Sequence, residues 1–219
     1  NNYFNGKTIL LTGGAGFIGS SLTKRLLSFG SKVISVDNFI SGRKENLVDL
    51  LDSNLVSKVE NLTFIQADVS QPVVNYLPEN VHLDLVLHFA SPASPPRYQA
   101  KPVETYLVNS IATHYLLDFL INNNPDARFL FAGTSEVYGD PLEHPQKESY
   151  WGNVNPNGER SCYDESKRLG ETICGVFSRS FRMDTRIVRI FNTYGPNMDP
   201  ADGRVIPNLI TQALKDQPF

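Results

Sequence analysis

Residues 12–20, TGGAGFIGS, place glycines at positions 13, 16 and 19, and this stretch decides how the surrounding chain folds. The apolar run KTILLT (7–12) before it is predicted to be a buried strand, and apolar residues recur at helical spacing over 17–29. Glycines between a strand and a helix allow a tight turn and let a pyrophosphate approach the helix N-terminus. Both GxxGxxG and GxGxxG spacings are present. The context predicts a dinucleotide-binding turn, with a glycine-rich turn that binds nothing as the alternative.

The strand and helix alternation continues along the whole chain. Five more apolar runs have strand length: KVISVD, LTFIQAD, LDLVLHFA, ARFLFAG and TRIVRIF. Residues 102–121 and 161–180 are predicted to be helices. Such alternation predicts an α/β fold, a doubly wound parallel sheet of the Rossmann type, whose ligands lie beyond the carboxyl ends of the strands. The polar stretch GTSEVYG (133–139) follows a predicted strand directly and is therefore expected at that edge.

Asp37 ends the second predicted strand and indicates which dinucleotide binds. A carboxylate there accepts hydrogen bonds from the adenosine ribose and repels the 2′-phosphate of NADP, so NAD is the predicted cofactor. The positively charged Arg43 nearby keeps NADP open as an alternative cofactor. Asp68 is expected at the adenine edge, unless it only caps a turn. The predicted cofactor-binding residues from this part of the chain are Gly13, Gly16, Phe17, Ile18, Gly19, Asp37, Asn38, Ser41, Gly42, Asp68 and Val69.

The stretch SCYDESK carries Tyr163 and Lys167 four residues apart, hence on one face of a helix. We expect the lysine ammonium to lower the pKa of the phenol from its usual value of about 10. A phenol tuned in this way can exchange a proton with a sugar hydroxyl while hydride moves to a nicotinamide. The pair is common by chance, but beside a dinucleotide fold it predicts an acid–base couple that also contacts the cofactor.

Composition argues against several other functions. Twenty Lys and Arg against 23 Asp and Glu give a net charge of −3 without a basic run, so nucleic acid and anionic membranes are not expected as main partners. Apolar runs fall short of the ~20 residues of a membrane helix. The four histidines lack ligand spacing, so no metal is expected, and His88 is predicted to be a core residue.

Cys162 and Cys174 fall in one predicted helix, roughly 18 Å apart at a rise of ~1.5 Å per residue, too far for a disulfide. We therefore expect free thiols and a reducing compartment, the cytoplasm. The N-terminus has no apolar signal core, but it also lacks an initiator Met, so a trimmed targeting or membrane segment stays an open alternative.

With its glycine motif and YxxxK, the chain resembles the extended short-chain dehydrogenase/reductases that modify nucleotide sugars. Within that family, four stretches most closely resemble the UDP-glucuronate decarboxylase (UDP-xylose synthase) branch: HFASPASPPRY, TSEVYGDPLEHPQ, YWGNVNPNGERSCYDESK and RIFNTYGPNMDPADGRV. The resemblance implies catalytic roles for Thr134, Ser135, Glu136, Tyr163 and Lys167. It implies cofactor contacts for Ala90 and Ser91, and substrate contacts for Tyr98, Asn109, Glu136, Asn192 and Arg204.

The resemblance also implies the reaction. Tyr163, helped by Lys167 and Thr134, would remove the carbon-4 hydroxyl proton as NAD takes hydride, and the resulting β-keto acid would lose carbon dioxide. Protonation at carbon 5 near Glu136 and return of hydride would give UDP-xylose and regenerate NAD. Related 4,6-dehydratases carry an aspartic acid in place of Ser135. A serine donates a proton poorly to a leaving group but hydrogen-bonds well to a carboxylate, which favours decarboxylation.

The resemblance divides the chain into an NAD-binding domain, residues 1–191, and the start of a substrate-binding lobe, residues 192–219, the rest of which is expected to be absent. The chain as given would then bind cofactor but turn over UDP-glucuronate poorly, and the complete protein is expected to be a homodimer. Two alternatives stay open: a nucleotide-sugar 4,6-dehydratase or epimerase, and a non-catalytic NAD-binding module.

Overall fold

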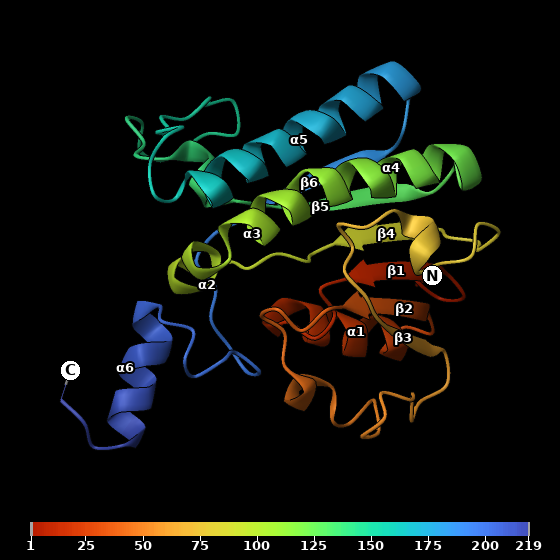
Figure 1. The fold of residues 1–219 in the computed structure, drawn as a ribbon, viewed down its shortest axis with the longest axis horizontal. Coiled ribbons are helices and arrows are strands. Elements are labelled where there is room, and N and C mark those ends of the chain that lie inside the picture. Colours follow the sequence, from red (N-terminus) through yellow and green to blue (C-terminus); the bar gives the residue numbers. More distant parts are fainter. Residues whose placement is uncertain (1, 219) are drawn as a thin grey trace.

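The computed structural model describes residues 2–218 and contains a parallel sheet in the order β3-β2-β1-β4-β5-β6 (Figure 1). Every pair of neighbouring strands is parallel. The strands are β1 (Thr8–Thr12), β2 (Lys32–Asp37), β3 (Leu62–Gln66), β4 (Leu85–His88), β5 (Arg128–Thr134) and β6 (Thr185–Ile190). The strand order reverses between β1 and β4, which opens a crevice beyond their carboxyl ends. The predicted doubly wound Rossmann fold is confirmed.

Helices connect the strands and cover both faces of the sheet (Figure 1). The helices are α1 (Phe17–Ser28), α2 (Pro95–Ala100), α3 (Pro102–Asn109), α4 (Ile111–Asn123), α5 (Ser161–Phe181) and α6 (Val205–Leu214), with short 3-10 helices η1 (Lys44–Leu47), η2 (Val73–Asn75) and η3 (Ser135–Tyr138). The predicted helices at 17–29 and 161–180 are confirmed. No helix among residues 2–218 is long and apolar enough to cross a membrane.

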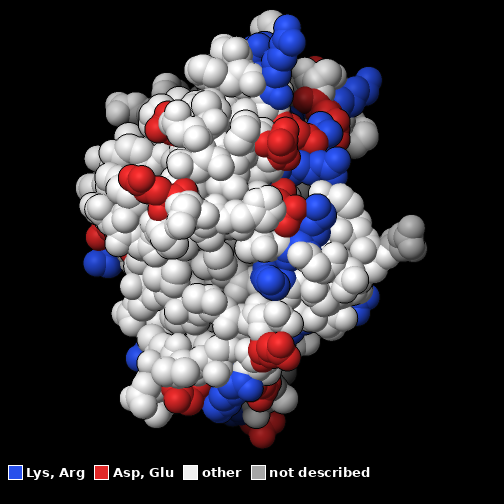
Figure 2. Space-filling model, turned by 90° about the vertical axis from the view of Figure 1, so that its right-hand side faces the viewer, with Lys and Arg blue, Asp and Glu red and all other residues white. Residues whose placement is uncertain are grey.

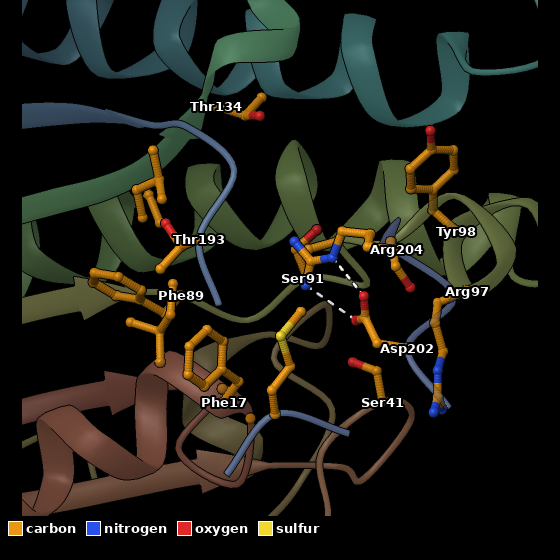
Figure 3. A pocket seen from close by; sticks show the side chains of 18 of the residues that line it. Phe17, Ser41, Phe89, Ser91, Arg97, Tyr98, Thr134, Thr193, Asp202 and Arg204 are labelled. Atoms are coloured by element: carbon orange, nitrogen blue, oxygen red, sulfur yellow. Dashed lines mark hydrogen bonds and ion pairs between the residues drawn. The ribbon is translucent and has the colours of Figure 1, made fainter. Parts of the chain in front are cut away.

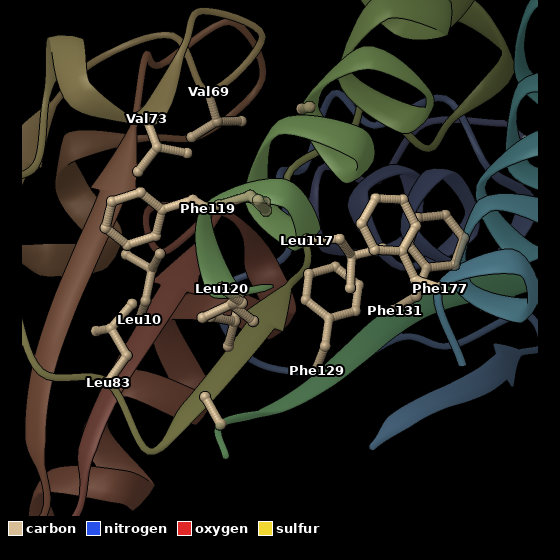
Figure 4. Packing of buried hydrophobic residues seen from close by; sticks show 14 of the residues in the cluster. Leu10, Val69, Val73, Leu83, Leu117, Phe119, Leu120, Phe129, Phe131 and Phe177 are labelled. Carbon is tan, nitrogen blue, oxygen red and sulfur yellow. The ribbon is translucent and has the colours of Figure 1, made fainter. Parts of the chain in front are cut away.

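Alternate residues of β1 belong to different hydrophobic clusters. Leu10 belongs to the cluster built with α4, α5 and the phenylalanines of β5. Figure 4 shows part of it, with Leu120 and Phe129 among the labelled side chains. Ile9 and Leu11 belong to the second cluster, with residues of α1 and η1. Because successive side chains of a strand point to opposite faces, each fully buried strand supplies both cores.

The helix predicted over 102–121 is divided, and this part of the prediction is wrong. The helix stops at Asn109, and a new one begins at Ile111. The hydroxyl of Ser110 donates to the carbonyl oxygen of Tyr106 over 2.5 Å, a contact that bends helices. The neighbouring Asn109 is fully buried and donates through Nδ2 to Ser166 Oγ on α5 over 3.0 Å. The apolar periodicity continues through this break, so the sequence pattern does not reveal it.

The chain after β6 returns to the carboxyl ends of the strands, where α6 lies on the same side of the molecule as α2 (Figure 1). The segment that follows β6 therefore contributes to the edge where the fold is expected to bind its ligands.

The face of the molecule opposite α2 and α6 is drawn in Figure 2. On this face, Lys and Arg are interspersed with Asp and Glu, and they form no patch of one sign.

Candidate active site

The ends of β1, β4, β5 and β6 border a cavity of about 360 Å³. A smaller cavity adjoins it beyond β2 and β3, and the two share Gly13, Gly16, Ser41 and Ser91 among their lining residues. Figure 3 shows the larger cavity with Phe17, Tyr98, Thr134 and Arg204 around it. Both cavities lie in the crevice that the strand order creates.

The glycine-rich turn forms the wall between β1 and α1. Gly13 has φ +77°, and a Cβ there would lie 2.7 Å from the backbone nitrogen of Ala90. A Cβ on Gly19 would lie 2.0 Å from the carbonyl oxygen of Gly13, so the turn and the helix pack too closely for any side chain. Gly16 caps α1 without a side-chain hydrogen bond. The N–H groups at this helix end are therefore available to an anion.

Asp37 lines the smaller cavity and is held in place by the backbone. Its carboxylate accepts hydrogen bonds from the backbone nitrogens of Ala15 and Phe39, both over 2.8 Å, and the residue is 7% exposed. Burial raises the pKa of Asp37, which the two backbone donors oppose. The remaining predicted cofactor residues around this cavity are Asn38, Ser41, Gly42, Asp68, Val69, Ala90 and Ser91.

Arg43, the residue that keeps NADP open as an alternative cofactor in the sequence analysis, is paired with two carboxylates. Its Nε lies 3.3 Å from Glu45 and its Nη1 lies 3.5 Å from Asp199. Arg97 on α2 also contacts Asp199 (Figure 3 labels Arg97). The guanidinium of Arg43 is thus turned partly toward the larger cavity rather than held free for a phosphate next to Asp37.

Tyr163 lies on the first turns of α5 at the other end of the larger cavity. It is 6% exposed, and burial raises its pKa to about 12, against the opposing effect of its hydrogen-bond partner Thr134. The expectation that Lys167 lowers the pKa of the phenol is wrong for this structure, because burial is the largest effect on Tyr163 and Lys167 is not among its causes.

Lys167 is buried together with Tyr163. Its Nζ donates to the carbonyl oxygen of Ala132 over 2.7 Å and lies 5.7 Å from the centroid of the Tyr163 ring. Burial lowers the pKa of Lys167 to about 7. With this pKa, the amino group is partly protonated at neutral pH. The side chain lies on the same face of α5 as Tyr163, as the i, i+4 spacing predicts.

Tyr98 and Asn109 were both predicted to face the substrate, and the structure places them differently. Tyr98 lines the larger cavity, and its ring stacks on that of Tyr163 with centroids 4.9 Å apart. Its hydroxyl is buried without a hydrogen-bond partner among the described residues. Asn109 lies in the core behind this pair, bonded to Ser166, whose hydroxyl in turn donates to the Tyr163 carbonyl oxygen over 3.0 Å. The predicted substrate contact of Asn109 stays untested, but the residue lines neither cavity.

Thr134, Ser135 and Glu136 line the larger cavity where β5 passes into η3. The Thr134 hydroxyl accepts from the Glu136 nitrogen over 3.2 Å, which fixes this turn. The Glu136 carboxylate pairs with Arg160, which precedes α5. The polar stretch GTSEVYG thus faces the cavity, as its position after a strand indicates.

Asn192 and Arg204, predicted to face a sugar nucleotide, also line the larger cavity. Arg204 is held by Asp202 through Nε over 2.5 Å and Nη2 over 3.0 Å (Figure 3). His88 is fully buried between Thr12 and Val108, and its burial lowers its pKa to about 3, so the prediction of a core histidine is confirmed. Among residues 2–218, no cluster of three or more His, Cys, Asp or Glu is placed to hold a metal ion.

Sequence reasoning missed four charged residues of the cavity: Arg97, Arg160, Asp199 and Asp202. Arg97 and Asp199 are 102 positions apart, and Arg160 pairs with a residue of a different element. No local spacing connects such residues. All four residues lie in the stretches SPPRY, GERSCYDE and MDPADGR, which are parts of the motifs that carry the family resemblance. Their presence in these motifs is the one sequence feature that could have indicated a place in the site.

Comparison with known proteins matches residues 9–219 to the family described as "NAD dependent epimerase/dehydratase family". UDP-glucuronic acid decarboxylase 1 of Arabidopsis thaliana is 48% identical over 211 residues, which cover 96% of this chain and 45% of that protein. The Xenopus tropicalis protein of the same name is 46% identical over 96% of this chain and 47% of its own length. The chain thus spans about half the length of the curated relatives it matches.

Solved structures give the same fold. A dTDP-glucose 4,6-dehydratase of Streptomyces venezuelae with NAD and TYD bound has a TM-score of 0.80 at 28% identity, over 95% of this chain and 62% of the other. A UDP-N-acetylglucosamine 4-epimerase of Methanobrevibacter ruminantium, in complex with UDP-N-acetylmuramic acid, has a TM-score of 0.77 at 30% identity, over 97% of this chain and 64% of the other.

Proposed function

This chain belongs to the NAD dependent epimerase/dehydratase family, and we propose that it is the NAD-binding and catalytic part of a UDP-glucuronate decarboxylase, a lyase that forms UDP-xylose through a 4-keto intermediate. The observation that carries the proposal is one cavity lined by the glycine turn, by Thr134, Ser135 and Glu136, and by Tyr163 with Lys167. The identity of 48% to a curated decarboxylase supports the same reaction over the alternatives.

NAD is the cofactor of this family, and the residues present fit it. The Gly13 and Gly19 backbones leave no space for a Cβ, and the open N-terminus of α1 suits a pyrophosphate. Asp37, which lines the smaller cavity, suits a ribose. When bound, NAD would supply the hydride acceptor for carbon 4 of the sugar and the donor for the final reduction.

Tyr163 and Thr134 would hold the oxygen on carbon 4 of the sugar. Tyr163, as the phenolate, would take the proton of that hydroxyl and become a phenol, with Lys167 beside it to stabilise the phenolate before the transfer. The resulting ketone is β to the carboxylate, so the bond to the carboxyl carbon breaks, carbon dioxide leaves, and the electron pair moves into an enolate. The hydroxyls of Tyr163 and Thr134 stabilise that developing charge. Glu136 would organise protonation at carbon 5.

Ser135 separates this proposal from dehydration. A 4,6-dehydratase needs an acid that protonates the departing carbon-6 hydroxyl, and a serine hydroxyl, with its high pKa, is a poor donor for that step. Its hydroxyl can instead donate a hydrogen bond to the carboxylate that a glucuronate carries at this position. The side chain lines the larger cavity beside Glu136, at 3.5 Å from Ser135 Oγ to Glu136 Oε1.

We also propose the division of the chain into the NAD-binding domain, residues 1–191, and the start of a substrate-binding lobe, residues 192–219. In support, β6 ends at Ile190, and residues 192–204 return to the cavity. A cytoplasmic homodimer through the helices at 102–121 and 161–180 completes the proposal. Val103 and Leu169 on these helices are 50% and 48% exposed, which suits an interface. Light scattering on the complete protein tests the dimer.

The test of function is an incubation of the complete protein with NAD and UDP-glucuronate, followed by identification of the nucleotide-sugar product. We expect UDP-xylose and carbon dioxide in equal amounts with no net change in NAD. Residues 1–219 alone should bind NAD and turn over much less substrate. Dehydration or epimerisation of a neutral hexose nucleotide, with UDP-glucuronate ignored, would replace this proposal by the alternative reaction, and NAD binding without any turnover would favour a non-catalytic module.

A further inference from the structure

The segment after β6, residues 192–204, forms one wall of the larger cavity and packs closely against two other walls. A Cβ on Gly195 would lie 3.4 Å from Cζ of Phe17, the first residue of α1. A Cβ on Gly203 would lie 2.8 Å from Cγ of Pro96 on α2. The segment therefore reaches from the N-terminus of α1, where the fold fits a pyrophosphate, to α2 on the far side of the cavity (Figure 3 labels Phe17).

Asp199 ties this segment to two arginines, and the reaction described above does not use it. Its Oδ1 lies 3.5 Å from Nη1 of Arg43, and its Oδ2 pairs with Nη2 of Arg97. Oδ1 also accepts from the backbone nitrogen of Ala201 over 2.9 Å, which fixes the carboxylate. The Asp199 side chain is 21% exposed, and those of Arg43 and Arg97 are 35% and 34% exposed. The three charges are thus partly buried, where ion pairs are stronger than on an open surface.

The two arginines belong to different halves of the crevice. The backbone nitrogen of Arg43 donates to the carbonyl oxygen of Ala15 over 3.0 Å, and the nitrogen of Ala15 donates to the Asp37 carboxylate over 2.8 Å. Arg43 is therefore part of the region that fits NAD. Arg97 lies on α2 directly before Tyr98, whose ring stacks on that of the proposed acid–base tyrosine. The carboxylate between the two arginines joins the cofactor side of the crevice to the side where the sugar is proposed to react.

The proposed reaction gives such a link a use. Hydride that leaves carbon 4 has to return within the same turnover, so the reduced cofactor has to stay bound until the last step. Its early release would strand a 4-keto sugar and leave the site without a hydride donor. A segment that is held down beside the N-terminus of α1 restricts the path by which a dinucleotide leaves the crevice.

We propose that Asp199 is a positioning residue that latches residues 192–204 between Arg43 and Arg97 and thereby slows the dissociation of the cofactor. The latch acts on the dinucleotide whichever sugar nucleotide reacts, and only its use in retaining the hydride rests on the proposed function. Loss of a partly buried ion pair corresponds to a change of roughly tenfold in rate, between the small effect of an exposed pair and the large effect of a fully buried one.

The experiment measures how fast NADH leaves the complete protein in the absence of any sugar nucleotide. Protein loaded with NADH is mixed with excess NAD, and the decay of the fluorescence of bound NADH gives the rate. We expect Asp199→Asn, which removes the charge and can keep the hydrogen bond from Ala201, to release NADH roughly tenfold faster. Arg97→Gln should have a similar effect. The double variant should differ less than about twofold from either single variant, because both changes open the same latch.

Two comparisons separate a latch of charges from a general loosening of the fold. Asp184→Asn is the matched control, because Asp184 also lies between two arginines, Arg128 and Arg186, just before β6, and its loss should leave the rate unchanged. At about 1 M salt, where the screening length is ~3 Å, the difference between the parent and Asp199→Asn should shrink. Thermal unfolding of each variant shows whether it is folded.

An unchanged rate in Asp199→Asn would overturn the inference. Slower release would overturn it as well, because the freed arginines would then hold the cofactor themselves. Effects of Asp199→Asn and Arg97→Gln that multiply in the double variant would show that the two residues act through separate contacts. Failure of the proposed function is seen separately, since the release of NADH is measured without UDP-glucuronate and does not depend on its decarboxylation.

Discussion

The amino group of Lys167 lies 5.7 Å from the centroid of the Tyr163 ring, and it donates its hydrogen bond to the carbonyl oxygen of Ala132 over 2.7 Å. The lysine and the phenol thus share one buried region, but each is shifted toward its neutral form by burial: the pKa of Lys167 falls to about 7 and that of Tyr163 rises to about 12. Burial therefore outweighs the proximity of the two side chains in setting their pKa values.

Lys167 gives the protein a measurable pH dependence of stability. Its pKa of about 7 in the folded protein lies below its unfolded value of about 10.4, so between these pH values the unfolded chain binds the additional proton and stability rises with pH. Lys167→Met should remove this slope. The Tm of Lys167→Met is expected to exceed that of the parent most near pH 6–7. This advantage should shrink as pH rises toward 10, because the parent becomes more stable. Thermal unfolding at several pH values checks this, and two parallel Tm curves would contradict it.

In the proposed mechanism Tyr163 takes the proton from the carbon-4 hydroxyl, so Tyr163→Phe should stop the reaction of the complete protein at its first step. We expect a loss of roughly 100-fold or more in kcat, with NAD affinity retained. Steady-state kinetics and a cofactor titration of the same sample separate the two effects. If the rate falls less than about tenfold, the phenol does not have the acid–base role.

Glu136→Gln should act after oxidation. Tyr163 and Thr134 remain, so a single turnover should still reduce cofactor and form some 4-keto sugar, but the later steps should slow if the carboxylate organises decarboxylation or protonation at carbon 5. The absorbance of the reduced nicotinamide, followed together with release of carbon dioxide, is the measurement. Parent rates for both signals would show that Glu136 takes no part in these steps.

Asp37→Asn should reduce the preference for NAD over NADP by about tenfold, because it removes the charge that repels a 2′-phosphate and keeps the shape of the side chain. The parent should bind NAD more tightly, since Arg43 is paired with Glu45 and Asp199. Calorimetric titration of both proteins with both cofactors tests the point. Equal binding of NADP by the parent would mean that Arg43 leaves its carboxylates to bind the phosphate.

Gly19→Ala should weaken NAD binding at least tenfold, because the added Cβ would lie 2.0 Å from the Gly13 carbonyl oxygen and would move the turn that we propose holds the pyrophosphate. The matched control is Gly175→Ala in α5, where the nearest atom to the new Cβ is the flexible end of Arg179 at 2.9 Å. The control should bind NAD normally and gain up to about 1 kcal/mol in stability. Equal NAD affinity in the two variants would contradict the role of the glycine turn.

The sequence by itself determined the six strands, the helices at 17–29 and 161–180, the glycine turn and the placement of Asp37, GTSEVYG and Tyr163 at one edge of the sheet. These features follow from local rules, because side-chain periodicity sets which residues are buried and parallel strands bring their carboxyl ends together. The spacing of Tyr163 and Lys167 likewise determined that they share a helical face.

Only the tertiary structure decided how these groups behave. Burial, which no spacing reveals, set the direction of the pKa shift of Tyr163 against expectation and also lowered the pKa of Lys167. The place of Asn109 depends on its contact with Ser166 of α5, and the pair of Arg160 with Glu136 joins two elements that meet only in the folded chain. Interactions between residues distant in sequence have no local pattern, because they arise from how the elements pack and not from the order of residues within each element.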